Sequence, residues 1–188
     1  MVARAISPVP VDAYLREESS AREKHEYVEG LVYAMAGASS RHNLVATNVL
    51  VALGGALRGK PCRAYNSDTK VRLREGERVR FYYPDVTVVC RPNPPTDVFH
   101  DEPVVVVEVL SDSTRRVDQG EKKDAYLRVA SLRTYLLVDP DRVEVVRWRR
   151  TEAGFVAESY ADLDGVIPLP EVDATVTVRE LYEGASFD

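Results

Sequence analysis

The chain has 188 residues, of which 45% are hydrophobic and 29% are charged, with 25 Lys and Arg against 30 Asp and Glu. This length predicts one globular domain, and an apolar content this high excludes an intrinsically disordered chain. No apolar run approaches the roughly 18–20 residues that span a bilayer, and the first residues lack the apolar stretch of a secretory leader, so we expect no membrane association.

Charge is distributed unevenly along the chain. Residues 151–188 hold one basic residue and nine acidic ones, whereas residues 1–150 hold 24 basic and 21 acidic residues. The net charge of −5 argues against nucleic-acid binding, yet a basic middle section permits contacts with phosphates. An ordinary solvated surface explains the same distribution equally well.

The two cysteines, Cys62 and Cys90, are too few for a disulfide framework and lack the spacing of a zinc site. We therefore expect both thiols to be reduced and the protein to be cytoplasmic.

Helices are predicted where apolar residues recur at helical spacing behind a capping residue, and strands where they alternate or run continuously between turn residues. In the first half of the chain, we expect a helix over residues 11–22, a strand or hairpin over 25–36, and a helix from Ser39 or Ser40 to about 57. Strands should follow over residues 62–73, 80–90 and 104–110. Beyond them we expect a helix from Ser113 or Thr114 to about 130, strands over 134–138 and 143–148, and a small β extension with one helical turn beyond 154.

This order of elements predicts an α/β (α+β) fold with a central mixed β-sheet flanked by helices. The continuous apolar run at residues 104–110 is typical of a strand that is buried on both faces. We expect a single domain over residues 1–188, with a core at about 10–150 and an acidic C-terminal extension at 151–188.

Two carboxylates interrupt otherwise apolar strands. Glu108 is the one polar residue within residues 104–110, and Asp85 precedes the largely aliphatic residues 86–89. An ionised carboxylate there costs on the order of several kcal/mol unless it is paired, hydrogen-bonded or bound to a cation. Adjacent strands could bring both carboxylates to one Mg²⁺ or Mn²⁺ ion. Alternatively, both are strand-end residues satisfied by backbone amides or by an arginine.

A lysine follows these carboxylates on the next expected helix. Asp118, Lys122 and Tyr126 recur every four residues and therefore share one helix face. This stripe could deliver the Lys122 ammonium to the two carboxylates, where it would orient an attacking water or neutralise charge on a phosphoryl group. The alternative is an exposed Asp–Lys pair worth about a few tenths of a kcal/mol. The neighbouring Lys123 points elsewhere and serves as a control.

Four motifs follow one another along the chain. They are Tyr83-Pro84-Asp85-Val86, Val107-Glu108-Val109-Leu110-Ser111, Asp118-x3-Lys122-x3-Tyr126 and Tyr135-Leu136-Leu137-Val138-Asp139. Together they resemble the Uma-type family of restriction endonucleases, within the PD-(D/E)XK nuclease superfamily. The similarity extends upstream through Glu29-Gly30, His42 and residues 67–72, and it covers roughly residues 10–150.

The resemblance implies a restriction-endonuclease-like core and divalent-metal-dependent hydrolysis of phosphodiester bonds. Asp85 and Glu108 match the two acidic positions of the superfamily signature, and Glu29 matches an accessory acidic position that can help to bind metal. The superfamily lysine usually follows the second acid by two residues, but Leu110 stands there in this chain. Lys122 matches the lysine that this family supplies from the following helix.

Three further positions are candidates for supporting roles. His42 also matches the family pattern, although a lone histidine near a helix start is often a capping or packing residue. Tyr126 is expected to pack or to hold the lysine in place. Asp68 and Lys70 lie on a strand that could form the edge of the site.

The leading hypothesis is a Mg²⁺-dependent endonuclease that hydrolyses DNA, with Mn²⁺ as a substitute metal and, from the resemblance, a homodimeric state. The alternative is a non-catalytic nucleic-acid-binding or regulatory protein that retains the nuclease fold. Leu110 at the usual lysine position and the negative net charge favour this alternative. A purely structural oligomer would neither bind nor cleave DNA.

Overall fold

The N-terminal part of the chain builds a five-stranded sheet with the strand order β2-β1-β5-β4-β7. The computed structural model describes residues 8–111 and 115–187. The strands are β1 (His25–Val28), β2 (Leu31–Ala34), β4 (Lys70–Glu75), β5 (Arg78–Tyr82) and β7 (Phe99–His100). Helix α1 (Val11–Glu18) packs on this sheet through Tyr14, whose ring contacts the rings of Tyr27 and Phe81. The predicted hairpin around Gly30 is confirmed, and Gly30 has a φ of 98° that favours glycine.

A six-stranded sheet with the order β11-β10-β9-β8-β6-β3 forms the centre of the molecule. Its strands are β3 (Arg63–Asn66), β6 (Val86–Val89), β8 (Pro103–Val109), β9 (Thr134–Asp139), β10 (Glu144–Thr151) and β11 (Gly154–Tyr160). Strand β8 is antiparallel to β6 and parallel to β9, so the sheet is mixed, as predicted. Strands β6 and β9 are buried along their whole length, and β8 along nearly all of it, because structure covers both faces of the sheet.

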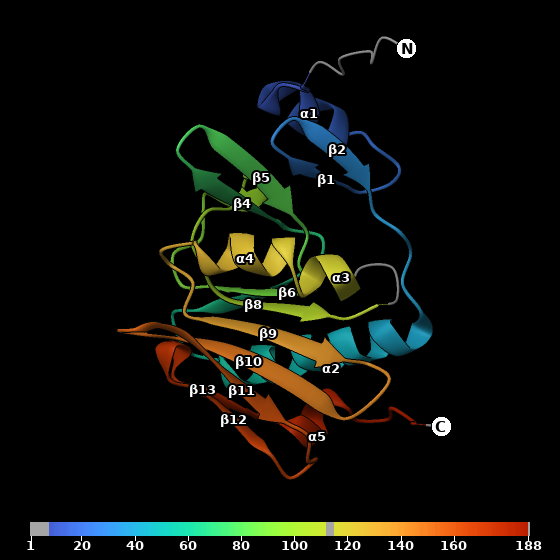
Figure 1. Cartoon of the computed structure of the whole chain (residues 1–188), viewed down its shortest axis with the longest axis vertical. Coiled ribbons are helices and arrows are strands. Elements are labelled where there is room, and N and C mark those ends of the chain that lie inside the picture. The colour runs from blue at the N-terminus through green and yellow to red at the C-terminus, as the bar shows by residue number, and fades with distance from the viewer. Residues whose placement is uncertain (1–7, 112–114, 188) are drawn as a thin grey trace.

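Helices cover both faces of this central sheet (Figure 1). Helix α2 (Ser40–Ala56) packs on one face through Val45, Val49 and Leu53. The side chain of Ser39 caps α2 by accepting a hydrogen bond from the backbone N–H of His42 at 3.2 Å. Short helices α3 (Arg115–Asp118) and α4 (Glu121–Leu127) cover the opposite face, between the two large sheets.

The acidic C-terminal extension folds onto α2 and completes the core on that side. It contains the hairpin of β12 (Val166–Leu169) and β13 (Ala174–Thr177), the 3-10 turn η1 (Pro170–Val172) and helix α5 (Val178–Leu181). Ile167 and Leu181 belong to the same buried cluster as Val49 of α2. The expectation of one domain over residues 1–188 stays a prediction, although this shared core agrees with it. In the described part of the chain, no helix is both long and apolar enough to cross a membrane.

Two of the expected strands are wrong, because each is split between the two large sheets. Residues 62–73 form β3 and β4, which a turn separates. Residues 80–90 break at Pro84, which has no N–H to continue the pairing. The neighbouring N–H of Tyr83 leaves the sheet and donates to Oε1 of Glu26 at 3.2 Å.

The helix expected up to about residue 130 is also corrected. It is interrupted at Gly120, which separates α3 from α4, and α4 ends at Leu127. Gly120 has φ and ψ angles of −114° and −107°, which no helical residue adopts. The two proposed caps, Ser113 and Thr114, lie outside the described residues.

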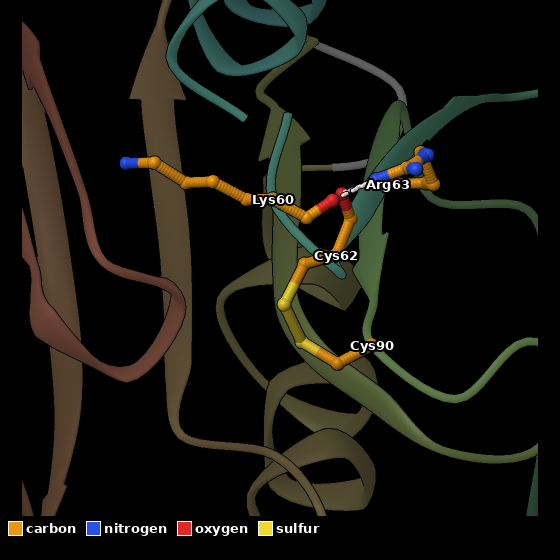
Figure 2. The surroundings of a disulfide bond; sticks show 4 residues. All are labelled: Lys60, Cys62, Arg63 and Cys90. Carbon is orange, nitrogen blue, oxygen red and sulfur yellow. Dashed lines mark hydrogen bonds between the residues drawn. A yellow bond between two sulfur atoms is a disulfide. The ribbon is translucent and has the colours of Figure 1, made fainter. Parts of the chain in front are cut away.

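Cys62 and Cys90 form a disulfide where β3 begins and β6 ends, which corrects the expectation of two reduced thiols (Figure 2). The register pairs Arg63 with Val89, so the two cysteines are the next residues outward on neighbouring strands. Sequence spacing alone could not reveal this pairing, because 28 positions separate the cysteines and only the strand register brings them together.

Candidate active site

Strands β6 and β8 bring the two predicted carboxylates next to each other. The register pairs Val86 with Val107, so Asp85 and Glu108 are the next residues along the two strands. Val107 belongs to the core cluster under α2, whereas Val106 belongs to the cluster under α4. Since successive side chains of a strand point to opposite faces, Glu108 points toward α4, on the same side as Val106.

Lys122 reaches Glu108 from helix α4. Its Nζ atom lies 2.9 Å from Oε1 of Glu108, 2.9 Å from Oε1 of Glu26 and 3.8 Å from Oδ1 of Asp118. Lys122, Glu108 and Asp118 are only 5%, 3% and 3% exposed, respectively. One buried ammonium group therefore faces three carboxylates. We call these four residues the carboxylate–lysine cluster.

The electrostatics of this cluster raise the pKa values of both Glu108 and Lys122. Burial raises the pKa of Glu108, the negative charges of its neighbours raise it further, and Lys122 compensates only in part. Burial lowers the pKa of Lys122, but the surrounding carboxylates reverse this effect and raise it above its usual value. The ammonium group therefore stays charged. Oε1 of Glu108 lies within ion-pair distance of Lys122, yet it accepts no hydrogen bond from the described residues.

His42 holds Asp85 from the side of α2. Its Nε2 atom lies 2.9 Å from the backbone oxygen of Val109 and 3.5 Å from Oδ2 of Asp85. The same carboxylate oxygen accepts a hydrogen bond from the N–H of Val109 at 2.7 Å. Burial lowers the pKa of His42, but Asp85 and the Val109 carbonyl outweigh it and raise the pKa above its usual value. His42 therefore helps to fix the position of the Asp85 carboxylate.

Most of these groups open into one cleft of about 410 Å³, which Glu26 does not line. Asp85, Glu108, Asp118, Lys122 and His42 line it. The structure thus brings together five residues that the sequence singled out, from β8, α2, α3, α4 and the turn before β6. The splitting of the expected helix at Gly120 does not separate Asp118 from Lys122, because both side chains still face the cleft.

Glu29 is not brought to this cleft. It lies in the turn between β1 and β2, where it pairs with Arg80 and lies 3.7 Å from Nε of Arg78. Glu26 on β1 contacts Lys122 instead, and the sequence analysis missed it. Alternation along β1 could have found Glu26, because Tyr27 faces the core under α1 and its neighbours therefore face the opposite side, toward α4.

Tyr126 and Lys123 also lie away from the cleft. The ring of Tyr126 is fully buried and lies 5.5 Å from the ring centres of both Tyr82 and Tyr135. Its position supports packing of α4 against the two sheets. The Nζ atom of Lys123 lies 5.4 Å from the ring centre of Trp148, on a different side of α4 from Lys122.

Asp68 and Lys70 lie beside the cleft and do not line it. Lys70 is 5% exposed and donates a hydrogen bond to the hydroxyl of Tyr83, which does line the cleft, at 2.9 Å. Asp68 forms an ion pair of 2.6 Å with Lys24. Both residues therefore support the wall of the cleft.

Metal ligands are not gathered into a closed site. Within the described residues, no group of three or more His, Cys, Asp or Glu side chains converges in a geometry that could hold a metal ion by itself. Asp85 and Glu108 supply two carboxylates in one cleft. This donor set suits a hard cation such as Mg²⁺, which uses one or two carboxylates and completes its shell with waters and substrate phosphates.

The chain is similar to known proteins over most of its length. The model of the Uma2 family, described as "Putative restriction endonuclease", matches residues 11–179. An uncharacterized protein of Synechocystis sp. is 33% identical over 178 residues, which cover 94% of this chain and 92% of the relative. A second uncharacterized protein of Synechocystis sp. is 32% identical over 129 residues, which cover 67% of this chain and 72% of the relative.

One solved structure has the same fold. It is the crystal structure of a protein from Anabaena variabilis described as a "putative nuclease belonging to DUF820". The TM-score is 0.73 at 17% sequence identity, and the alignment covers 93% of this chain and 97% of the other. The predicted restriction-endonuclease-like α+β architecture is confirmed at the level of the fold.

Proposed function

Because the chain belongs to the Uma2 family of nuclease-fold proteins, we propose that it is a metal-dependent endonuclease that hydrolyses phosphodiester bonds of DNA in the cleft around Glu108. One observation carries this proposal. A carboxylate that is 3% exposed lies in an aliphatic strand, with two further carboxylates and a single ammonium group around it. Such an excess of buried negative charge is costly unless a cation or a proton enters the site.

Asp85 and Glu108 are the residues that would hold the divalent cation, Mg²⁺ or Mn²⁺. When bound, such an ion supplies an activated water and neutralises charge on the phosphoryl group. The donor set fits, because Oε1 of Glu108 has no hydrogen bond within the described residues and both side chains line the same cleft. Glu29 is left out of this site, because it is engaged with arginines elsewhere.

Lys122 acts as an electrostatic group and not as a base. Its raised pKa keeps the ammonium protonated at neutral pH, so it cannot accept a proton from the attacking water. It can donate hydrogen bonds to the water or to a non-bridging phosphoryl oxygen, whose negative charge grows as the water oxygen bonds to phosphorus. Glu26 and Asp118 hold the ammonium group in position for this contact. His42 fixes the Asp85 carboxylate.

Metal binding is tested by titrating Mg²⁺ and Mn²⁺ into the wild type and into Glu108→Gln by isothermal calorimetry. We expect the wild type to bind and the variant to bind at least tenfold more weakly, because one of two carboxylates is lost. Equal affinities for the two proteins would remove the metal site from the proposal.

Catalysis is tested with two neighbouring lysines on α4. Lys122→Ala should abolish cleavage of a plasmid in the presence of Mg²⁺, whereas Lys123→Ala should retain it, because Lys123 lies over Trp148 and outside the cleft. Equal losses in both variants would mean that lysine charge acts only by general attraction to DNA.

A second candidate function is a non-catalytic nucleic-acid-binding or regulatory protein. It is supported by Leu110 at the usual lysine position and by the three contacts that already engage Lys122. It requires salt-dependent binding of DNA without metal-dependent cleavage of single-stranded, double-stranded or branched substrates. Cleavage that Glu108→Gln abolishes would exclude it.

Compartment and oligomeric state are also proposals. We propose a cytoplasmic homodimer, and the edge strand β2 supports the dimer, because Leu31, Val32 and Tyr33 are 45%, 41% and 51% exposed. Light scattering of the purified protein should give twice the mass of the chain. Fractionation of the producing cells tests the compartment, because a cytoplasmic protein should be recovered with the cytoplasmic fraction, and recovery with another fraction would refute this part of the proposal.

A further inference from the structure

A groove lined with arginines lies outside the cleft, between the β4–β5 hairpin and the end of α4. It consists of two adjoining cavities of about 500 and 130 Å³, which share Leu73, Arg74, Arg128 and Val129 in their walls. The arginines that line it come from β4, β5 and the end of α4, and we call this surface the arginine groove. They are Arg72, Arg74, Arg78, Arg80 and Arg128.

The carboxylates around the arginine groove do not match all of its positive charge. Asp101 is engaged by Arg72, with N–O distances of 2.6 and 2.7 Å. The other nearby acids are Glu29, Glu75 and Glu102, and the first two of these are shared among Arg78, Arg80 and Arg128. Arg74 is exposed and forms no ion pair or hydrogen bond through its side chain within the described residues; it attracts Asp101 only from a distance.

Two more arginines extend the positive charge along the segment after α4. Arg150 donates to the backbone oxygens of Leu127, Val129 and Leu132 at 2.7–3.2 Å, and this fixes the segment that carries Arg128. Burial lowers the pKa of Arg150, and the nearby positive charge of Arg133 lowers it further. Arg150 therefore fixes the segment that carries Arg128, and Arg133 and Arg150 add positive charge outside the groove itself.

We propose that the arginine groove binds the phosphodiester backbone of a nucleic acid, away from the bond in the cleft. The guanidinium group is planar and permanently charged, and it binds a phosphate through two parallel hydrogen bonds. Arg74 and Arg128 are exposed on opposite walls of the groove, so both can reach one strand. The inference rests on the proposed function in one respect, namely that the substrate is a nucleic acid.

The groove and the cleft contact separate stretches of the backbone. They lie at opposite ends of α4, because Lys122 lines the cleft near the start of the helix, whereas Arg128 and Val129 line the groove just after its end. Helix α4 also carries the exposed Glu121 and Asp124. These two carboxylates would repel a strand that crossed over the helix. Substitution of arginines in the groove should therefore weaken DNA binding without changing the side chains that line the cleft.

The test measures binding of a fluorescent 30-base-pair DNA duplex by anisotropy, in EDTA so that no cleavage occurs, at several salt concentrations. The Arg74→Gln/Arg128→Gln double variant should bind at least tenfold more weakly than the wild type. Its slope of log affinity against log salt should be smaller by about two, since each lost phosphate contact removes about 0.9. Both side chains are exposed, so both proteins should show the same melting temperature.

Arg58→Gln is the matched control, because Arg58 is exposed just after α2, which packs on the face of the central sheet opposite α4, and it lines no part of the groove. It should keep the affinity and the salt slope of the wild type. The proposal is overturned if the double variant binds as the wild type does, if Arg58→Gln loses as much, or if poly-glutamate competes as well as DNA. If the wild-type protein binds DNA through the groove but never cleaves it, the proposed nuclease activity is refuted and the proposed binding at the groove is retained.

Discussion

Replacing Lys122 by methionine tests the carboxylate–lysine cluster most directly. The change keeps the length of the side chain and removes the ammonium group from among Glu26, Glu108 and Asp118. Removing one partner of a buried ion pair costs about 3–5 kcal/mol, because the remaining charge is left uncompensated. At pH 8 we therefore expect the free energy of unfolding of Lys122→Met to be lower by this amount.

The pH dependence of this deficit has a defined sign. The pKa of Glu108 is already raised in the folded protein, and removal of Lys122 raises it further. The folded variant therefore binds more protons than the unfolded chain between the ordinary glutamate pKa of about 4.3 and the raised one. The stability of the variant relative to the wild type should rise as the pH falls from 8 toward 5.

Urea unfolding followed by circular dichroism at pH 8 and pH 5 measures both effects. Lys123→Met is the matched control and should cost less than about 1 kcal/mol at either pH, because its ion pair with Asp124 is partly exposed. Adding 10 mM Mg²⁺ should restore part of the stability of Lys122→Met. A deficit no larger than that of Lys123→Met, or one that grows on acidification, would refute the charge balance derived for the cluster.

Three further outcomes are expected. Ser39→Ala removes the N-cap of α2 and should lower the free energy of unfolding by about 1 kcal/mol. The melting temperature should then fall by about 2–4 °C, and an unchanged melting temperature would contradict the role of Ser39 as a cap. Burial acts to raise the pKa of Asp139, but its bonds to Arg115 and to the N–H of Asp141 lower it overall. Asp139→Asn should therefore cost about 1.5–3 kcal/mol at pH 7. This cost should shrink as the pH falls below the ordinary aspartate pKa of about 3.9, because the wild-type carboxyl then becomes protonated; a cost that does not change with pH would argue against the ion pair. Loss of the Cys62–Cys90 bond, by reduction or in the Cys62→Ser/Cys90→Ser variant, should lower the free energy of unfolding by about 2–4 kcal/mol. Urea unfolding with and without reductant measures this loss. Equal stability under both conditions would show that strand pairing alone holds β3 against β6.

The sequence by itself identified the groups that do not belong in a hydrophobic core. An acid inside an aliphatic strand stands out whatever the fold, and the four-residue spacing of Asp118, Lys122 and Tyr126 survives the break at Gly120. The hairpin at Gly30, the cap at Ser39 and the buried strand β8 were also predictable, because each depends on a few adjacent residues. Local physical chemistry is sufficient for features of this kind.

Tertiary structure decided everything that depends on register or on which sheet a strand joins. Alternation along β1 separates Glu26 from Glu29, but only the packing of the sheet against α4 brings Glu26 to Lys122 and leaves Glu29 among arginines in a turn. The disulfide likewise depends on the pairing of β3 with β6. Contacts between residues far apart in the chain form only when the whole core packs, so the sequence specifies them collectively and no short segment shows them.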